Sequence, residues 1–158
     1  KDSEYDQIEK DTIESLIDNS SDEKPEWTGK KEKQAMTTSS SLGREKPKRD
    51  PQVAADALAH AGYVCEFDEK DRTFKRKNGK AYTEPHHLIP ISKYRDFDYS
   101  VDVMENIVSL CSHCHNLLHY GRMEDKIPVL KKLYDERINA LKTVGLEITF
   151  DQLKGYYR

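Results

Sequence analysis

Apolar residues follow two different spacings in the second half of the chain. Residues 82–91 combine aromatic, threonine and β-branched side chains, and residues 107–111 read IVSLC, so both segments are typical of short strands. Next, Leu117 and Leu118 lie beside His115 and His119 at helical spacing, and Gly121 is placed as a helix stop. The pattern therefore predicts a strand, a long loop, a second strand, a turn and a helix.

Further helices are predicted on both sides of this unit. Asp50 and Pro51 form a helix start, with Asp as the N-cap and Pro at the first position, and the apolar positions that follow predict a helix up to Gly62. Apolar steps of three and four residues predict a long amphipathic helix within residues 123–144, and a short helix follows Thr149. Near its end, Tyr156 and Tyr157 are predicted to be packing residues.

The first third of the chain has a different composition. Residues 1–20 show helix-like spacing, whereas residues 21–48 are mostly Ser, Thr, Lys, Glu and Gly, which is typical of a disordered segment. We predict an acidic helix in residues 1–20 as the tail of a domain that precedes Lys1, a flexible linker in residues 21–48, and a folded domain in residues 49–158. The alternative for residues 1–20 is an oligomerisation or docking helix.

Charge is distributed unevenly along the 158 residues, whose net charge is −3. Residues 1–26 carry three basic and ten acidic side chains, residues 27–50 carry seven basic and three acidic ones, and the rest is neutral. If this neutral domain binds nucleic acid, bulk charge alone cannot hold the ligand, and local clusters of Lys and Arg have to contribute. Candidate phosphate contacts surround the tight-turn signal Asn78-Gly79 or lie in the loop of residues 92–105: Lys75, Arg76, Lys77, Lys80, Lys93 and Arg95. In that same loop, Asp96, Asp98 and Asp102 are expected to be solvated.

Five of the six histidines lie in residues 82–122. Neighbouring side chains on a strand point to opposite faces, so His86 and His87 cannot both face one site. His115 and His119 are four residues apart, which places them on one helix face within reach of one ion. With His86 they would form three ligands and leave an open position, the arrangement of catalytic metal sites. His87 is then the candidate general base, because histidine titrates near neutral pH.

Taken together, the segments EPHHLIP, VMENIVSLC and CHNLLHYG resemble the HNH nuclease motif in its ββα-metal setting, and most closely its McrA-like restriction endonuclease branch. The resemblance implies an α+β fold, with a small ββα-metal core, flanking helices and a largely disordered N-terminal segment.

The same resemblance assigns roles to individual residues. It implies that His87 activates water, that His86 and His115 are metal ligands, and that His119 is a third ligand or a phosphate contact. Asn106 matches the middle letter of the motif, and in the family this residue braces the long loop and so orients the base. Glu84 lies where some relatives carry an acid near the metal.

The cysteines indicate a second metal site. Many family members close a structural zinc site with two Cys-x-x-Cys pairs; here Cys111 and Cys114 form one pair, but the other reads CEFD, from Cys65 to Asp68. Three interpretations remain open. Zinc is held by the three cysteines and Asp68, or by the three cysteines and a histidine such as His113, or the thiols are buried without a metal.

These features predict a metal-dependent DNA endonuclease that hydrolyses phosphodiester bonds with a histidine general base, in restriction of foreign or modified DNA. The resemblance implies Mg, Mn, Ni or Zn as the ion, and an all-imidazole shell favours Mn, Co, Ni or Zn over Mg. The expected partner is double-stranded DNA, modified or unmodified, cut by a homodimer or nicked by a monomer. Three cysteines without a signal-peptide pattern or a long apolar run indicate a cytoplasmic protein without a membrane partner.

Two alternatives follow from the same residues. One is a zinc-stabilised nucleic-acid-binding module without catalysis. The other is an interaction domain in which the histidines are only packed.

Overall fold

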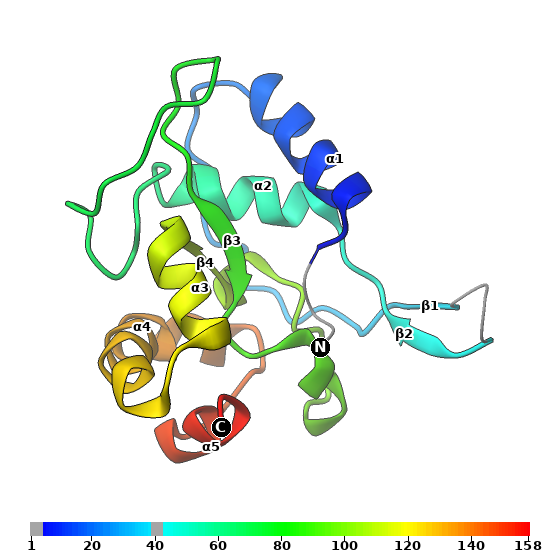
Figure 1. Cartoon of the computed structure of the whole chain (residues 1–158). Coiled ribbons are helices and arrows are strands. Elements are labelled where there is room, and N and C mark those ends of the chain that lie inside the picture. The colour runs from blue at the N-terminus through cyan, green and yellow to red at the C-terminus, as the bar shows by residue number, and fades with distance from the viewer. Residues whose placement is uncertain (1–4, 39–42) are drawn as a thin grey trace.

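A two-stranded sheet carries the histidine pair at the centre of the molecule. The computed structural model describes residues 5–38 and 43–158. In it, β3 (Glu84–His87) pairs antiparallel with β4 (Ile107–Leu110), and α3 (Ser112–Tyr120) follows β4 directly and lies beside β3 (Figure 1). The predicted order of elements and the α+β fold are confirmed. The first strand is shorter than residues 82–91, because the chain turns at Pro90 into the 3-10 helix η1 (Ile91–Asp96).

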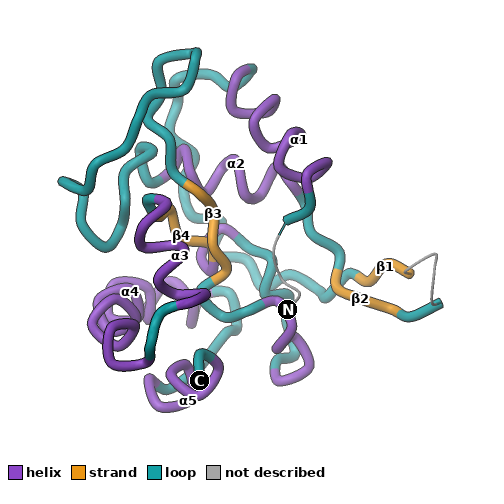
Figure 2. The backbone as a smooth tube through the Cα atoms, viewed as in Figure 1, coloured by secondary structure: helices purple, strands orange, loops and turns teal. Residues whose placement is uncertain are grey.

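Helices cover this unit on both sides (Figures 1 and 2). On one side, α2 (Pro51–His60) begins at Asp50, whose side chain accepts a hydrogen bond from the Gln52 N–H. On the other side lie α4 (Met123–Thr143) and α5 (Phe150–Tyr156), which pack with β4 and α3 in the main hydrophobic core. A second short 3-10 helix, η2 (Met104–Asn106), leads directly into β4. Among the described helices, none combines the length and the apolar character needed to cross a membrane.

The N-terminal helix is part of the folded core. α1 (Gln7–Asp18) starts at a capping box, in which Asp6 and Glu9 each accept a hydrogen bond from the other's backbone N–H. Its buried Ile13 and Ile17 pack with Leu58 of α2 in a second hydrophobic cluster. The interpretation of residues 1–20 as the tail of another domain is therefore not supported, because the apolar stripe is covered by α2.

Residues 21–38 and 43–48 are attached to the domain at several points, in contrast to the expected flexible linker. The Trp27 ring lies 3.8 Å from that of His60, and the Gly29 N–H donates to the buried Glu105 carboxylate at 2.9 Å. The Gln34 side-chain amide donates to three backbone carbonyls of the 92–105 loop, those of Tyr94, Phe97 and Tyr99. A short antiparallel pair, β1 (Met36–Thr38) and β2 (Glu45–Pro47), follows. The polar composition of this segment did not reveal these anchors, which are few and depend on distant partners.

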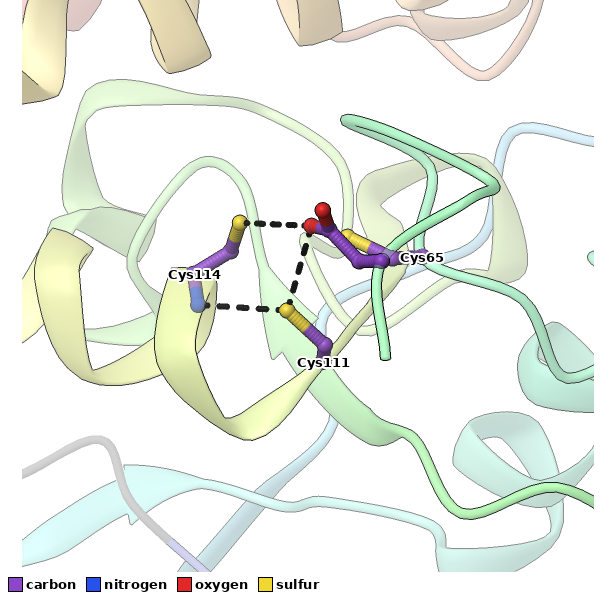
Figure 3. A group of neighbouring side chains, drawn as sticks. Cys65, Cys111 and Cys114 are labelled. Carbon is purple, nitrogen blue, oxygen red and sulfur yellow. Dashed lines mark hydrogen bonds between the residues drawn. The ribbon is translucent and has the colours of Figure 1, made fainter. Parts of the chain in front are cut away.

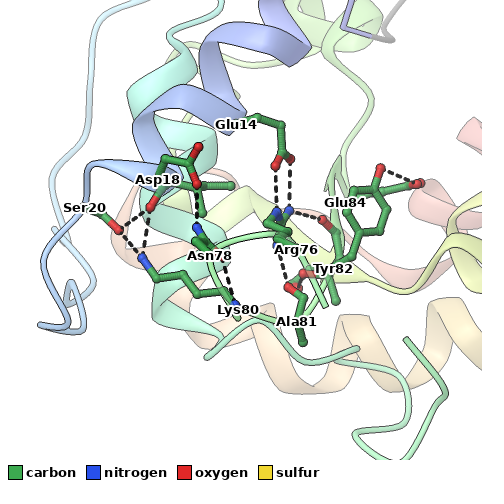
Figure 4. Close-up of polar contacts among 12 residues, drawn as sticks. Glu14, Asp18, Ser20, Arg76, Asn78, Lys80, Ala81, Tyr82 and Glu84 are labelled. Carbon is green, nitrogen blue, oxygen red and sulfur yellow. Dashed lines mark hydrogen bonds and ion pairs between the residues drawn. The ribbon is translucent and has the colours of Figure 1, made fainter. Parts of the chain in front are cut away.

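The tight turn at Gly79 is fastened to α1 (Figure 4). Arg76 is buried, forms an ion pair with Glu14 at 2.7 Å and donates to the carbonyls of Ala81 and Thr83. The Lys80 ammonium donates to the carbonyl of Ile17 at 2.9 Å and to the Ser20 hydroxyl. The two cations predicted to contact phosphate, Arg76 and Lys80, thus both bind α1 or the residues after it in this structure, and their contact with phosphate stays a prediction. Lys75 and Lys77 are exposed.

Candidate metal and nuclease site

Three imidazoles from two elements converge beside the sheet. His86 comes from β3, and His115 and His119 come from one face of α3. One nitrogen from each ring can be chosen so that all three lie within 4.8 Å of one another, and the Nε2 atoms of His115 and His119 are 3.1 Å apart. The spacing of four residues on a helix has placed the last two as predicted. The three rings form one compact group of nitrogen donors.

The tautomer of His115 is set by Glu84. The Nδ1 of His115 lies 2.6 Å from the Glu84 carboxylate, which leaves Nε2 toward the other two rings. Glu84 also accepts hydrogen bonds from Tyr82 and Ser112. Burial acts to raise the pKa of Glu84, but the hydrogen bond and charge of His115, with the two hydroxyls, lower it overall. An ionised carboxylate on the far nitrogen is the common support of a metal-binding histidine.

Tyr157 supports His86 in a comparable way. Its hydroxyl lies 2.8 Å from Nε2 of His86 and donates to the carbonyl of Leu88 at 2.6 Å. Because the hydroxyl proton goes to that carbonyl, the hydroxyl oxygen accepts from the Nε2–H of His86, and Nδ1 remains for an ion. Tyr157, at the end of α5, was expected to be a packing residue. The far nitrogens of His86 and His115 are thus held by neighbouring oxygens, and a set of three imidazole nitrogens suits a divalent transition metal.

His87 points away from the three-histidine group, as the alternation of a strand requires. Its Nε2 lies 2.8 Å from the Asp102 carboxylate, and the two side chains are 3% and 6% exposed. The expectation that Asp102 is solvated is therefore wrong. The loop folds back toward β3, and the second oxygen of Asp102 accepts from the Asp50 N–H at the start of α2. The sequence offered no signal that separates Asp102 from Asp96 and Asp98.

Asn106 is fully buried and closes the loop between the strands. Its side-chain oxygen accepts from the Ile89 N–H, and its amide group donates to the carbonyls of Ile89 and Val101. One amide thus ties the chain just after His87 to the chain just before Asp102. The geometry agrees with the bracing role that the HNH resemblance implied.

A cavity of about 430 Å³ connects the three-histidine group with His87. Its lining includes His86, His87 and His119, so the candidate base and two candidate ligands share one space. Of the predicted phosphate contacts, Lys93 lines this cavity, whereas Arg95 is exposed and lies over the Tyr94 ring. The remaining lining residues include Lys126 and Arg158, which sequence reasoning did not single out.

The three cysteines meet at a separate site near the start of α3 (Figure 3). The fourth group there is Asp71, whose carboxylate accepts from the thiols of Cys111 and Cys114, each at 3.3 Å. Asp68, the carboxylate predicted as fourth ligand, instead accepts from the Lys70 N–H in a local turn, and the structure brings Asp71 to the thiols in its place. The turn between Asp68 and Asp71 decides which carboxylate reaches the thiols, and the spacing of the CEFD segment could not show this.

The pKa shifts at this site favour negative charge on Cys65 and Asp71, whereas the hydrogen bond to Cys65 and burial raise the pKa of Cys114. A hydrogen bond from Cys114, against the effect of burial, lowers the pKa of Cys65 to about 6, whereas burial raises the pKa of Cys111 to about 11. Burial acts to raise the pKa of Asp71, but hydrogen bonds from the thiols lower it overall. Three thiols and a carboxylate that lie together within 4.8 Å form a candidate metal site whose donors suit zinc.

The class of the domain follows from a comparison with protein families. Residues 65–121 match the HNH endonuclease family, and this range holds both strands, the four histidines of the site and the cysteine cluster. The chain therefore carries an HNH endonuclease domain, and the resemblance seen in its motifs is confirmed.

Two individual proteins are similar to this chain. One is the type IV methyl-directed restriction enzyme EcoKMcrA of Escherichia coli (strain K12), which is 38% identical over 74 residues, covering 47% of this chain and 25% of that protein. The other is the structure of the type IV phosphorothioation-dependent restriction endonuclease ScoMcrA, with 25% identity and a TM-score of 0.47, covering 61% of this chain and 17% of that one. The chain thus spans about a quarter of the curated relative that it matches.

Proposed function

We propose that this chain is a metal-dependent DNA endonuclease that hydrolyses phosphodiester bonds in double-stranded DNA. The observation that carries the proposal is the meeting of His86, His115 and His119, with His87 in the cavity beside them. Three imidazoles with an open side are the pattern of a catalytic rather than a structural metal site.

Each side chain then has a defined task. His86, His115 and His119 would hold one divalent ion, with Mn, Co, Ni and Zn favoured over Mg by the nitrogen ligands. When bound, the ion supplies positive charge for the scissile phosphate and the leaving 3′-oxygen. His87 takes a proton from the attacking water, and Lys93 in the same cavity attracts the DNA backbone.

Three thiols and Asp71 support a further part of the proposal. Zinc held by Cys65, Asp71, Cys111 and Cys114 would fasten the start of α3 to the segment that precedes β3. Because α3 carries His115 and His119, this zinc would fix the helix that presents two catalytic ligands. The proposed zinc is structural, since all four positions are protein ligands.

The biological role proposed is restriction of foreign or modified DNA in the cytoplasm. EcoKMcrA, which is 38% identical to this chain over 74 residues, is described as a methyl-directed restriction enzyme. Unmodified and methylated plasmids are therefore the substrates to compare.

The test is cleavage of supercoiled plasmid by purified protein with Mn²⁺, Mg²⁺, Ni²⁺, Co²⁺ or Zn²⁺, and with EDTA as the metal-free control. We expect metal-dependent conversion to open circles, or to linear DNA if a homodimer cuts both strands. His87→Ala should abolish cleavage and retain the metal, whereas His115→Ala should lose both. His113→Ala is the matched control, because His113 is an exposed histidine on the same helix.

Two results would contradict the proposal. DNA binding without cleavage under every metal and on both plasmids would favour a zinc-stabilised binding module. Cleavage by His87→Ala at near the wild-type rate would show that another group is the base.

A further inference from the structure

Asp102 lies directly against the candidate base His87. Its carboxylate lies 2.8 Å from Nε2 of His87, and both side chains are almost fully buried. A carboxylate on one nitrogen of an imidazole fixes which nitrogen carries the proton and which way the ring faces. The geometry points to Asp102 as the positioning residue of His87, an inference that rests on the proposed nuclease function.

The pairing defines the proton path on His87. An ionised carboxylate only accepts hydrogen bonds, so the neutral ring must donate its N–H from Nε2 to Asp102. Nδ1 is then the nitrogen with a lone pair, and it receives the proton from water. When that proton arrives, the imidazolium is stabilised by the adjacent carboxylate, and Nε2–H stays in place throughout the step.

Asp102 is itself held from three sides. One of its oxygens accepts from the Asp50 N–H at 2.7 Å, and its own N–H donates to the Ser100 hydroxyl at 3.0 Å. The carbonyl of the preceding residue, Val101, accepts from the buried Asn106 amide. Such contacts preorganise the carboxylate before substrate arrives. The start of α2 and the HNH asparagine therefore both act on the base through one side chain.

A test uses Asp102→Asn and, as matched control, Asp98→Asn, because Asp98 is an exposed aspartate of the same loop. The amide keeps the shape of the side chain but removes its charge, and it can turn either an N–H or a C=O to the ring, so the tautomer is no longer imposed. We expect kcat of plasmid cleavage to fall about 10- to 100-fold with KM and the Mn²⁺ dissociation constant unchanged. Asp98→Asn should equal the wild type.

A spectroscopic readout separates positioning from a structural role. Two-bond ¹H–¹⁵N correlation spectra of the wild type should show His87 as the Nε2–H tautomer, assigned by loss of its signals in His87→Gln. Asp102→Ala should lower the Nε2–H share toward that of an unconstrained imidazole while circular dichroism shows an intact fold.

The outcomes are separable from those of the nuclease proposal. If the wild type cleaves DNA and Asp102→Asn cleaves at the same rate, Asp102 does not position the base and the nuclease function stands. If the wild type fails to cleave, the function fails and the positioning role with it, whichever tautomer is seen. A wild-type spectrum with His87 as the Nδ1–H tautomer overturns the inference, even if the Asp102 variants do not fold.

Discussion

Replacing Asn106 by Ala should destabilise the domain strongly. The change removes three hydrogen bonds of 2.8 to 3.0 Å, to the Ile89 N–H, the Ile89 carbonyl and the Val101 carbonyl. Asn106 is fully buried, so water cannot easily replace the lost partners. A buried group left without its partner costs about 1–3 kcal/mol, and three such losses with partial relaxation give roughly 3–6 kcal/mol. This is a large part of the ~5–15 kcal/mol that stabilises a typical domain.

Urea denaturation followed by circular dichroism measures the effect. With a slope of about 2 kcal/mol per molar urea, the midpoint should fall by about 1.5–3 M. Asn116→Ala is the control, because Asn116 is an exposed asparagine on α3, and it should change stability by no more than about 0.5 kcal/mol. If Asn106→Ala costs less than about 1 kcal/mol, the amide does not brace the loop and the reasoning from its hydrogen bonds is refuted.

Three further predictions concern other parts of the structure. Asp71→Ala should lower the zinc content after dialysis and reduce Tm, whereas Asp68→Ala should leave both near wild type; equal zinc content in the two variants would contradict the assignment of the fourth ligand. Ile17→Ala, at a fully buried position of α1, should cost about 2–4 kcal/mol in urea denaturation. Ile8→Ala, at a 78% exposed position of the same helix, should cost less than about 0.5 kcal/mol, and equal costs would mean that α1 is not docked. Arg137→Met removes a buried guanidinium that binds both carboxylate oxygens of Glu66. Thermal unfolding should show that the free energy of unfolding falls by about 3–5 kcal/mol, and a variant as stable as the wild type would contradict this.

Local spacing determined the central unit of this protein. The strand-like segments around His87 and Val108, and the four-residue step from His115 to His119, predict a ββα unit because strand and helix periodicity fix side-chain direction within one element. The same rule separates His86 from His87, and the structure has them facing different partners. The HNH motif added Asn106, whose side chain makes hydrogen bonds to Ile89 and Val101 at the two ends of the loop.

Only the tertiary structure decided which distant side chains complete each site. Asp102 and not Asp98 reaches His87, Asp71 and not Asp68 reaches the thiols, and Tyr157 reaches His86 from the far end of the chain. It also decided that α1 belongs to the core and that Arg76 serves this packing. The physical reason is that spacing along the sequence fixes direction only within a helix or a strand. Contacts between elements depend on how loops fold back and on which faces are buried, and neither can be deduced from the local spacing of residues.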